Sequence, residues 1–373
     1  MSAPASRRSP WFRRHPRAAL ALGIVGATLV LDFATATALR SAGLVDFDRP
    51  DAHYRMSHPV YSHGLRPNVD CTAQWGAARY PMRTDSLGCR DFAPRRLAPV
   101  PSGPRVLLIG DSFGEGVGVA YEDCFAGILT QRFAARGIEV VNASAASYSP
   151  WVYDAKVRYL VEHEGLVFDH LVVCIDASDI DDEVRRLGAG PDATAPRQNP
   201  VVALWRAYVR DHSLLFGSAA VVSRWLRGRA DQRRASDWRA ALDHPRCRWA
   251  IDDEVFAREG ARGAEAARQA MDRLVEFVRA RGIPMTVVLY PWPDFVARRD
   301  GGRYVAMWRQ WCADREVPLI DCCPRFFAAG DTPEAVIRRA FIPGDVHLTR
   351  AGNDLVAECI EAGLPAEIPA LPR

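Results

Sequence analysis

The chain contains a single lysine, Lys156, and it has no Cys-x-x-Cys pair and no internal repeat. Its nine cysteines follow no metal-ligand spacing, which excludes a zinc site of the usual pattern. The glycines between positions 110 and 118 lack the spacing of a dinucleotide-binding turn, and no Lys-Ser/Thr pair follows them as in a P-loop. We therefore expect no metal and no organic cofactor, and a phosphate-binding protein is disfavoured.

Acidic residues are absent from the first 17 positions, which carry five arginines. The formal net charge of the whole chain is +3, so the remainder has a charge of −2 (3 − 5). A nearly neutral body gives no support for nucleic-acid binding, which depends on clustered positive charge. We expect no nucleic-acid partner, and the sequence leaves the oligomeric state open.

The basic head at 1–17 leads into an apolar segment, Ala18–Ala38, with one charged residue, Asp32. About 20 apolar residues cross a bilayer, and arginines before the segment favour a cytoplasmic N-terminus. The segment is either a transmembrane anchor or a signal peptide cleaved at a small-residue site, 34–36 or 36–38. Asp32 weakens the anchor, because a carboxylate within a span costs about 2.5–3.5 kcal/mol. Both alternatives place the rest of the chain outside the cytoplasm, either membrane-anchored or secreted.

Residues 39–104 are rich in proline, glycine, aspartate and arginine and show little periodicity, which indicates a stalk and a loop-rich cap. Cys71 and Cys89 in this region are the pair that we would test for a disulfide.

From residue 105 onward, apolar runs alternate with amphipathic stretches. The strand-like runs are Arg105–Ile109, Glu139–Asn142, Leu171–Ile175, Pro284–Tyr290 and Pro318–Asp321, and the helix-like stretches lie at about 124–136, 151–164, 261–281, 304–315 and 349–362. This alternation predicts an α/β domain over residues 105–365, with a mostly parallel five-stranded sheet covered by helices on both faces.

Residues 180–255 interrupt the alternation after the third strand. Asp179 to Glu183 opens an acidic loop, a Pro-rich piece follows at 191–200, and helical stretches bearing arginine and tryptophan occupy 201–230 and 236–241. We interpret this region as a helical insertion that forms a lid. Its tryptophans are either packing anchors of the lid or a surface that stacks on a glycan.

Two short segments carry the chemistry: GDSF at Gly110–Phe113 and GDVH at Gly344–His347. In the first, an apolar strand delivers Ser112 to a sharp turn; in the second, Asp345 precedes His347 by two residues. A serine hydroxyl is a weak nucleophile until a base takes its proton and a carboxylate orients that base. The segments supply all three groups and predict acyl chemistry. Otherwise Ser112 is a turn-forming or helix-capping serine and His347 is a surface histidine.

Small polar residues also follow each of the first three strands, at 111–112, 142–147 and 176–179. In an open parallel sheet these turns meet at the carboxyl edge, where ligands bind. With the distal Asp-x-His, this layout resembles the SGNH (GDSL-like) hydrolase superfamily, and within it the membrane-anchored, exopolysaccharide-associated branch. The resemblance covers about residues 80–360 and rests on DSLGCRD (Asp85–Asp91), VLLIGDSFGEGVGV (106–119), YPWP (Tyr290–Pro293) and GDVHLTRAGN (Gly344–Asn353).

The resemblance implies a three-layer α/β/α, flavodoxin-like fold with Ser112 as nucleophile, His347 as base and Asp345 as its orienting acid. The oxyanion positions depart from the family: Ser147 stands where a glycine N–H is usual, and Ser178 stands where an asparagine side chain is usual. One lost oxyanion donor typically costs about 10²–10³ in rate.

Asp111, Asp179 and Trp292 are possible substrate-binding residues. Asp179 either faces the site or caps the segment that follows it. Trp292 either forms a wall that faces a sugar or packs under the lid.

These expectations together describe an exported serine acyl hydrolase or O-acyltransferase that acts on ester groups of a polysaccharide, so its substrate is a carbohydrate ester. The two altered oxyanion positions motivate an alternative: a non-catalytic module of the same fold that binds glycan or assembles with a polysaccharide export system.

Overall fold

The computed structural model describes residues 15–42, 44–45, 50–189, 212–234, 237–330, 332–365 and 368–369. The chain divides into two compact units: residues 1–49 with 198–227, and residues 50–197 with 228–373. The Pro-rich piece expected at 191–200 and most of the basic head lie outside the described residues.

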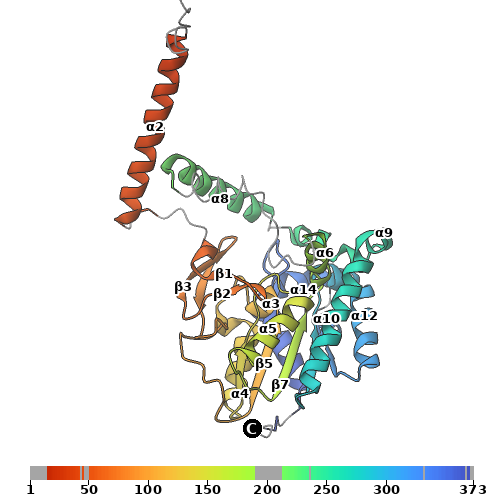
Figure 1. Ribbon diagram of the computed structural model, residues 1–373. Helices are drawn as coiled ribbons and strands as arrows, with labels where there is room; N and C mark the ends of the chain where they lie inside the picture. The colour runs from red at the N-terminus through yellow and green to blue at the C-terminus, as the bar shows by residue number, and fades with distance from the viewer. Residues whose placement is uncertain are drawn as a thin grey trace, which may run out of the picture. The chain divides into compact units, whose positions relative to one another are not determined.

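A five-stranded parallel sheet forms the centre of the larger unit (Figure 1). Its strands lie in the order β6-β5-β7-β8-β9, with every neighbouring pair parallel. Every residue of β5, β7 and β8 is buried, so each of these strands is mostly apolar rather than alternating between apolar and polar residues. The strands are β5 (Arg105–Gly110), β6 (Glu139–Asn142), β7 (His170–Ile175), β8 (Met285–Leu289) and β9 (Leu319–Asp321). This order is the flavodoxin-like one, and it confirms the predicted sheet.

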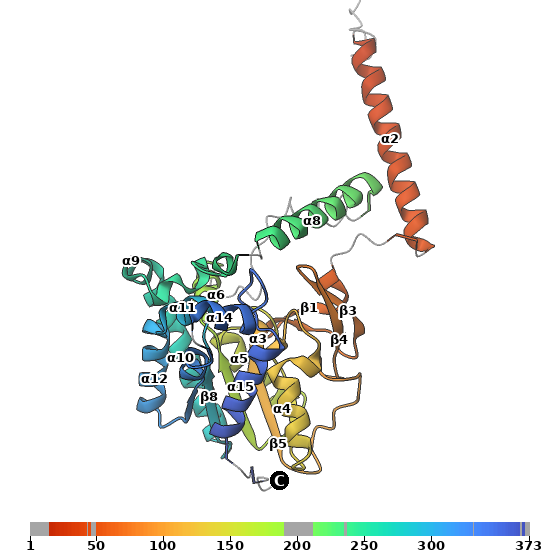
Figure 2. The same ribbon diagram turned by 180° about the vertical axis from the view of Figure 1, so that it is seen from behind.

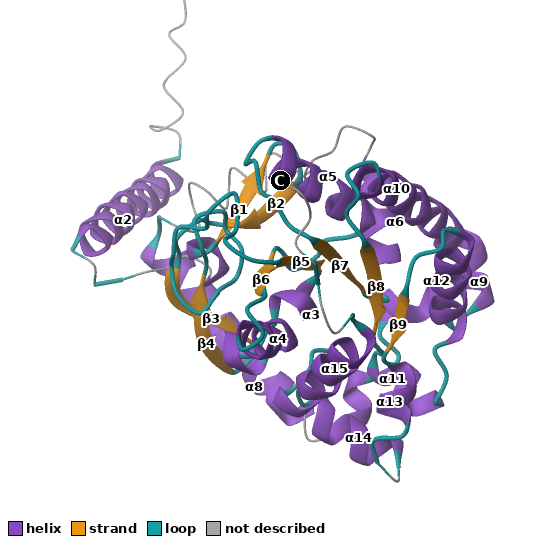
Figure 3. Cartoon of the chain, turned by 90° about the horizontal axis from the view of Figure 1, so that it is seen from below, coloured by secondary structure: helices purple, strands orange, loops and turns teal. Residues whose placement is uncertain are grey.

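Helices cover both faces of this sheet. Figure 3, which looks along the strands, shows α5 (Pro150–Glu162) and α10 (Ala261–Arg279) on one face and α4 (Phe125–Ala134) and α15 (Arg350–Gly363) on the other. In the view from behind, α4 and α15 lie side by side, in agreement with their direct contact (Figure 2). The three-layer α/β/α prediction is confirmed.

The five predicted helices of this domain correspond to α4, α5, α10, α12 (Gly302–Asp314) and α15, and their ends differ from the expected ones by no more than two residues. Shorter elements were not predicted, because one or two turns give too little periodicity to recognise. They are α3 (Ser112–Glu115), η2 (Tyr121–Asp123), α11 (Pro293–Arg298), α13 (Cys323–Phe327) and α14 (Pro333–Ala340).

Residues 50–104 belong to the same unit as the sheet and are more regular than the loop-rich cap that the sequence indicated. After η1 (Pro50–His53) they form two antiparallel ribbons, β1–β2 and β3–β4, whose buried side chains join the main core. The strands are β1 (Arg55–His58), β2 (Ser62–Leu65), β3 (Asp70–Trp75) and β4 (Ala78–Arg83). Cys71 and Cys89 are free thiols here, so the disulfide considered for them is not formed.

The insertion after β7 begins with a helix, and the prediction of an acidic loop at this point was wrong. Asp179 starts α6 (Asp179–Ala189), because acidic side chains in a first turn face the positive end of the helix dipole. The insertion also contains α8 (Leu214–Arg234) and the short elements η4 (Trp238–Ala241), η5 (Pro245–Ala250) and α9 (Asp253–Val255). The π-helical turn η6 (Phe256–Gly260) follows it and leads into α10. Trp249 is buried and its Nε1 donates to Ala177 O at 2.7 Å, so this tryptophan is a packing anchor.

The smaller unit contains α2 (Pro16–Ser41), a helix of 26 residues. Among the described residues, α2 alone is long and apolar enough to cross a membrane, and its place near the N-terminus suits a signal sequence equally well. Most of its side chains are exposed; Asp32 and Ala36, one turn apart, are buried.

Candidate active site

Ser112 is the first residue of the short helix α3, which follows β5 at the carboxyl end of the sheet. Asp111 is the helix cap, and its side chain accepts a hydrogen bond from the Phe113 N–H at 3.0 Å. The chain passes close to its neighbours here, since a Cβ on Gly110 would lie 2.9 Å from Cys174 and one on Gly114 would lie 2.4 Å from the Ser144 hydroxyl. Glycines on both sides of the serine are therefore a steric requirement of the turn.

Asp345 and His347 lie in the loop before α15, and the structure brings them together. Asp345 Oδ1 accepts from His347 Nδ1 at 2.6 Å and from the His347 backbone N–H at 2.9 Å. His347 is buried, and its other ring nitrogen, Nε2, has no hydrogen-bond partner among the described residues. With Nδ1–H held by the carboxylate, Nε2 is left as the lone-pair nitrogen of a neutral imidazole.

The charges of this pair support each other. Burial lowers the pKa of His347, but the Asp345 carboxylate outweighs it, so the net effect is a raised pKa. Burial raises the pKa of Asp345, yet the interaction with His347 brings it below its usual range. Asp345 therefore stays ionised while His347 titrates, as an orienting acid must.

Trp75 completes this group, and the sequence did not point to it. It ends β3, donates from Nε1 to Asp345 Oδ2 at 2.7 Å, and places its ring 5.0 Å from the His347 ring. The residue is 39% exposed, so part of it is accessible to solvent. No local motif could have identified it, because the contact joins positions 270 residues apart.

The Ser112 hydroxyl is oriented toward Asp111 rather than toward the histidine. Its Oγ donates to Asp111 Oδ2 at 3.0 Å, and within the described part of the chain no hydrogen bond joins it to His347. Phe113, the next residue, lies with its ring 5.1 Å from that of His347, so the serine turn and the histidine loop are neighbours. Nucleophile and base often meet only when substrate is bound.

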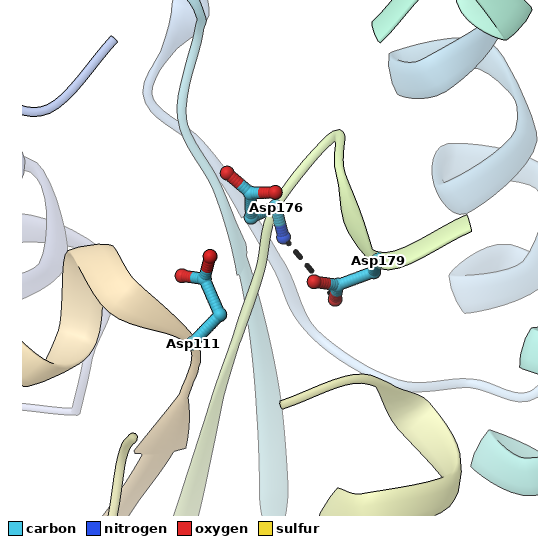
Figure 4. Close-up of side chains that lie close together, drawn as sticks. All are labelled: Asp111, Asp176 and Asp179. Carbon is cyan, nitrogen blue, oxygen red and sulfur yellow. Dashed lines mark hydrogen bonds between the residues drawn. The ribbon is translucent and has the colours of Figure 1, made fainter. Parts of the chain in front are cut away.

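Three buried carboxyls converge behind the serine, from the turns after β5 and β7 (Figure 4). One oxygen each of Asp111, Asp176 and Asp179 lies within 4.8 Å of the others. Burial, with the neighbouring Asp176 carboxylate, raises the pKa of Asp111 to about 8, and the same causes raise that of Asp179.

Protein donors already serve this acidic group. Trp292 Nε1 donates to Asp176 Oδ2 at 2.6 Å, the Ser178 N–H donates to the other oxygen, and the Tyr153 hydroxyl donates to Asp179 at 2.9 Å. Among the described residues these three carboxyls form a group that could hold a cation, and one of their oxygens, Asp179 Oδ1, is buried without a hydrogen-bond partner.

The turn after β6 carries Ser147 in the left-handed conformation, with φ of 64°. A glycine adopts this conformation without strain, and glycine is the residue that the resemblance implies at this position. The Ser147 N–H forms no hydrogen bond within the described residues. Its neighbour Ala146 is fixed from both sides, by an N–H donated to Glu115 Oε2 at 2.7 Å and a carbonyl 2.9 Å from His63 Nε2.

The cap therefore supports this turn. Arg55 on β1 forms two hydrogen bonds to the fully buried Glu115, at 2.8 and 3.0 Å. His63 on β2 contacts the Ala146 carbonyl directly. Neither residue was singled out from the sequence, because each acts across at least 60 positions.

A model of the GDSL-like lipase/acylhydrolase family matches residues 108–355, from the strand before Ser112 to the helix after His347. The chain belongs to this family. Membership confirms the expected SGNH (GDSL-like) assignment and the expectation of an ester hydrolase. No curated protein matches the chain.

Several solved structures are similar to this GDSL-like chain at low sequence identity. A catalytic mutant of an acetylxylan esterase from Geobacillus stearothermophilus is 13% identical over 74% of this chain and 100% of its own, with a TM-score of 0.39. A psychrotrophic esterase from Pseudoalteromonas sp. is 12% identical over 69% and 95%, with a TM-score of 0.38. A GDSL-like lipase from Bacteroides thetaiotaomicron is 12% identical over 71% and 90%, with a TM-score of 0.36. At these values the likeness says nothing of the substrate.

The remaining expected site residues of this GDSL-like chain are buried. Trp292 is 2% exposed and lies against the rings of His244 and Phe113, so its place is that of a packing residue. Asp179 is held by Tyr153, and Ser178 is 2% exposed with its N–H bound to Asp176. Of the expected set, Ser147 is exposed, and Ser112 and Asp345 are partly exposed.

Proposed function

We propose that the protein is a serine acyl-ester hydrolase or O-acyltransferase with Ser112 as nucleophile, His347 as base and Asp345 as orienting acid. One observation carries this assignment: His347 is held at Nδ1 by Asp345, while its buried Nε2 has no partner beside the serine turn. A buried polar atom without a partner is costly, and a base waiting for the proton of a nucleophile accounts for it.

The reaction begins with a rotation of the Ser112 side chain from Asp111 toward His347 Nε2. The hydroxyl oxygen attacks the acyl carbon while its proton passes to Nε2, and a tetrahedral oxyanion forms. The Ser147 N–H and the Ser178 hydroxyl are the candidate donors to that oxyanion. Collapse expels the alcohol, which takes the proton from His347. Water or a sugar hydroxyl then attacks the acyl-enzyme and restores Ser112.

The exposed aromatic residue beside His347 favours a carbohydrate ester as the substrate class. Trp75 presents a half-exposed indole within 5.0 Å of the His347 ring, and a flat aromatic face beside a polar catalytic group suits an amphipathic sugar ring. An exported enzyme whose chain resembles the exopolysaccharide-associated branch would meet such esters on polysaccharides.

We place the catalytic unit outside the cytoplasm, anchored through α2. The arginines of the basic head precede this helix and favour a cytoplasmic N-terminus. Secretion after cleavage at 34–36 or 36–38 is the competing outcome, and the N-terminal sequence of the mature protein distinguishes the two.

The decisive experiment compares the wild type with Ser112→Ala on 4-nitrophenyl acetate, with a fluorophosphonate probe as second readout. We expect the probe to label Ser112 and the variant to lose both hydrolysis and labelling. Ser102→Ala, which changes an exposed serine in the loop before β5, is the matched control and should behave as wild type. Equal rates in wild type and Ser112→Ala, with no labelling of Ser112, would overturn the proposal.

A further inference from the structure

Within the smaller unit, the one charged residue of the apolar helix is bonded to the start of α8. The Leu215 backbone N–H donates to Asp32 Oδ1 at 3.0 Å, and the Ser213 hydroxyl accepts from the Phe216 N–H at 3.1 Å. A helix leaves its first N–H groups unpaired, and its positive dipole end favours an acid there. Asp32 is therefore part of the cap of another helix, which offsets the cost of a carboxylate in an apolar segment.

The position of Asp32 along α2 sets the depth at which α8 begins. At 1.5 Å per residue, 26 residues extend about 39 Å, which exceeds a hydrocarbon core of about 30 Å by roughly 9 Å. Asp32 lies about 13 Å along the helix before Ser41. If the helix extends equally beyond both sides of the hydrocarbon core, Asp32 lies about 9 Å below the outer boundary of that core. Helices that lie in a membrane interface bury their apolar face about 5–10 Å deep. The two depths agree.

The amino-acid sequence of α8 changes character along the helix. Residues 214–223 contain no charged residue, and the large side chains Leu215, Val221, Val222 and Leu226 are all more than 40% exposed. From 224 to 234 the sequence contains five arginines, one acid and Trp225. An apolar stretch followed by basic and aromatic residues matches acyl chains followed by anionic headgroups.

Small residues are buried on both helices close to the hydrogen bond. Ala36 lies one turn from Asp32 on α2, and Gly217 lies two residues from Leu215 on α8. Small residues let helix backbones approach closely in a membrane, where packing and hydrogen bonds replace the hydrophobic effect.

We infer that α8 is a second membrane element, which lies in the outer interface of the bilayer that α2 spans and is attached to α2 through Asp32. The inference rests on the anchoring proposed above. The partner of α8 in this proposal is the lipid surface. Acyl chains contact the segment at 214–223, and anionic headgroups lie along the arginine-rich half. Since α8 belongs to the insertion after β7, the membrane holds the enzyme at the insertion as well as at its N-terminus.

The test uses the full chain in vesicles of phosphatidylcholine with a minority of phosphatidylglycerol, doped with a diazirine lipid that reacts on illumination. We expect peptide mapping to find lipid adducts on α2 and on residues 214–223. Asp32→Leu keeps α2 apolar but removes the acceptor, and it should lower the adducts on α8 about fivefold, the factor typical of one lost hydrogen bond. Asp32→Asn keeps an acceptor oxygen and should leave them unchanged.

The outcomes separate this inference from the anchoring on which it rests. Adducts on α2 without adducts on α8 overturn the inference and leave the anchor standing. An unlabelled α2 overturns the anchor and the inference with it. If α8 carries no lipid adducts and a separate bifunctional photo-cross-linker joins α8 of two copies, α8 is a contact between copies and the inference is overturned. An unchanged thermal midpoint of the catalytic unit in detergent excludes misfolding as the cause of any loss.

Discussion

Trp75 Nε1 donates to Asp345 Oδ2 at 2.7 Å, while the other oxygen of Asp345 accepts from His347 Nδ1 at 2.6 Å. One carboxylate thus joins a residue of the cap to the proposed base. Each of its oxygens has a donor, so the carboxyl group is held on both sides and cannot rotate without losing a bond.

Trp75→Phe removes this hydrogen bond and keeps an aromatic ring. We expect kcat for 4-nitrophenyl acetate to fall about tenfold, because the loss of one charge-assisted bond leaves Asp345 and then His347 less well oriented. A larger loss on an acetylated oligosaccharide than on the aryl ester would reveal an additional sugar contact. Trp311→Phe is the matched control, since Trp311 Nε1 donates to Asp272 at 2.8 Å away from the site. Equal effects of the two substitutions would contradict a role for Trp75 in the site.

Asp345→Asn tests the charge that orients His347. The neutral imidazole is the base, and Asp345 raises the pKa of His347 above its ordinary 6.5, so kcat/KM of the wild type should rise with pH through a midpoint above that value. Without the carboxylate, burial dominates and the midpoint moves to lower pH, while the maximal rate falls on the order of 10³–10⁴. The pH profiles of both proteins, measured with one ester, check this. If the midpoint on the acidic side of the pH profile is the same in both proteins, the pairing of Asp345 with His347 is refuted.

Asp111→Asn tests the carboxyl that holds the Ser112 hydroxyl. Asp111 has a raised pKa of about 8, so it is neutral at lower pH and ionised above. A charged carboxylate accepts a stronger hydrogen bond than a neutral carboxyl, so ionisation holds the serine away from His347, and activity should decline as pH rises through about 8. Asparagine keeps an acceptor for the Phe113 N–H and does not titrate, so its profile should stay level at alkaline pH. If the activity of the variant still declines at alkaline pH, a group other than Asp111 causes the decline.

Ser147→Gly and Ser147→Val test the left-handed backbone of the proposed oxyanion turn. With φ of 64°, glycine relieves strain and should raise the free energy of unfolding by about 0.5–1 kcal/mol with activity retained, because the N–H is unchanged. Valine is strained there and should lower stability by about 1–2 kcal/mol and reduce kcat as the turn shifts. Urea unfolding and ester hydrolysis measure both effects. Glycine and valine variants with the same kcat would argue against an N–H donor at this position.

Most of the fold could be predicted, and the reason lies in how parallel sheets are built. β5, β7 and β8 are buried on both faces, so each appears in the sequence as a mostly apolar run without alternation. The cap ribbons escaped prediction, because β3 alternates weakly and gains its order from pairing with β4 and from packing on the core. The start of α6 was predicted as an acidic loop, but acidic residues are also typical of the first turn of a helix, where they face the positive end of its dipole.

For the site, the sequence by itself determined which groups are present and where along the chain they lie. Ser112 follows an apolar strand, and Asp345 lies two residues before His347, so the serine turn and the acid–base pair are properties of short segments. Only the tertiary structure decided that Ser112 is oriented toward Asp111, that Trp75 holds Asp345, and that Arg55 and Glu115 support the turn of Ser147. Those contacts join side chains that are far apart in the sequence. Packing brings each donor to its acceptor, and no local periodicity or motif shows which distant donor that will be.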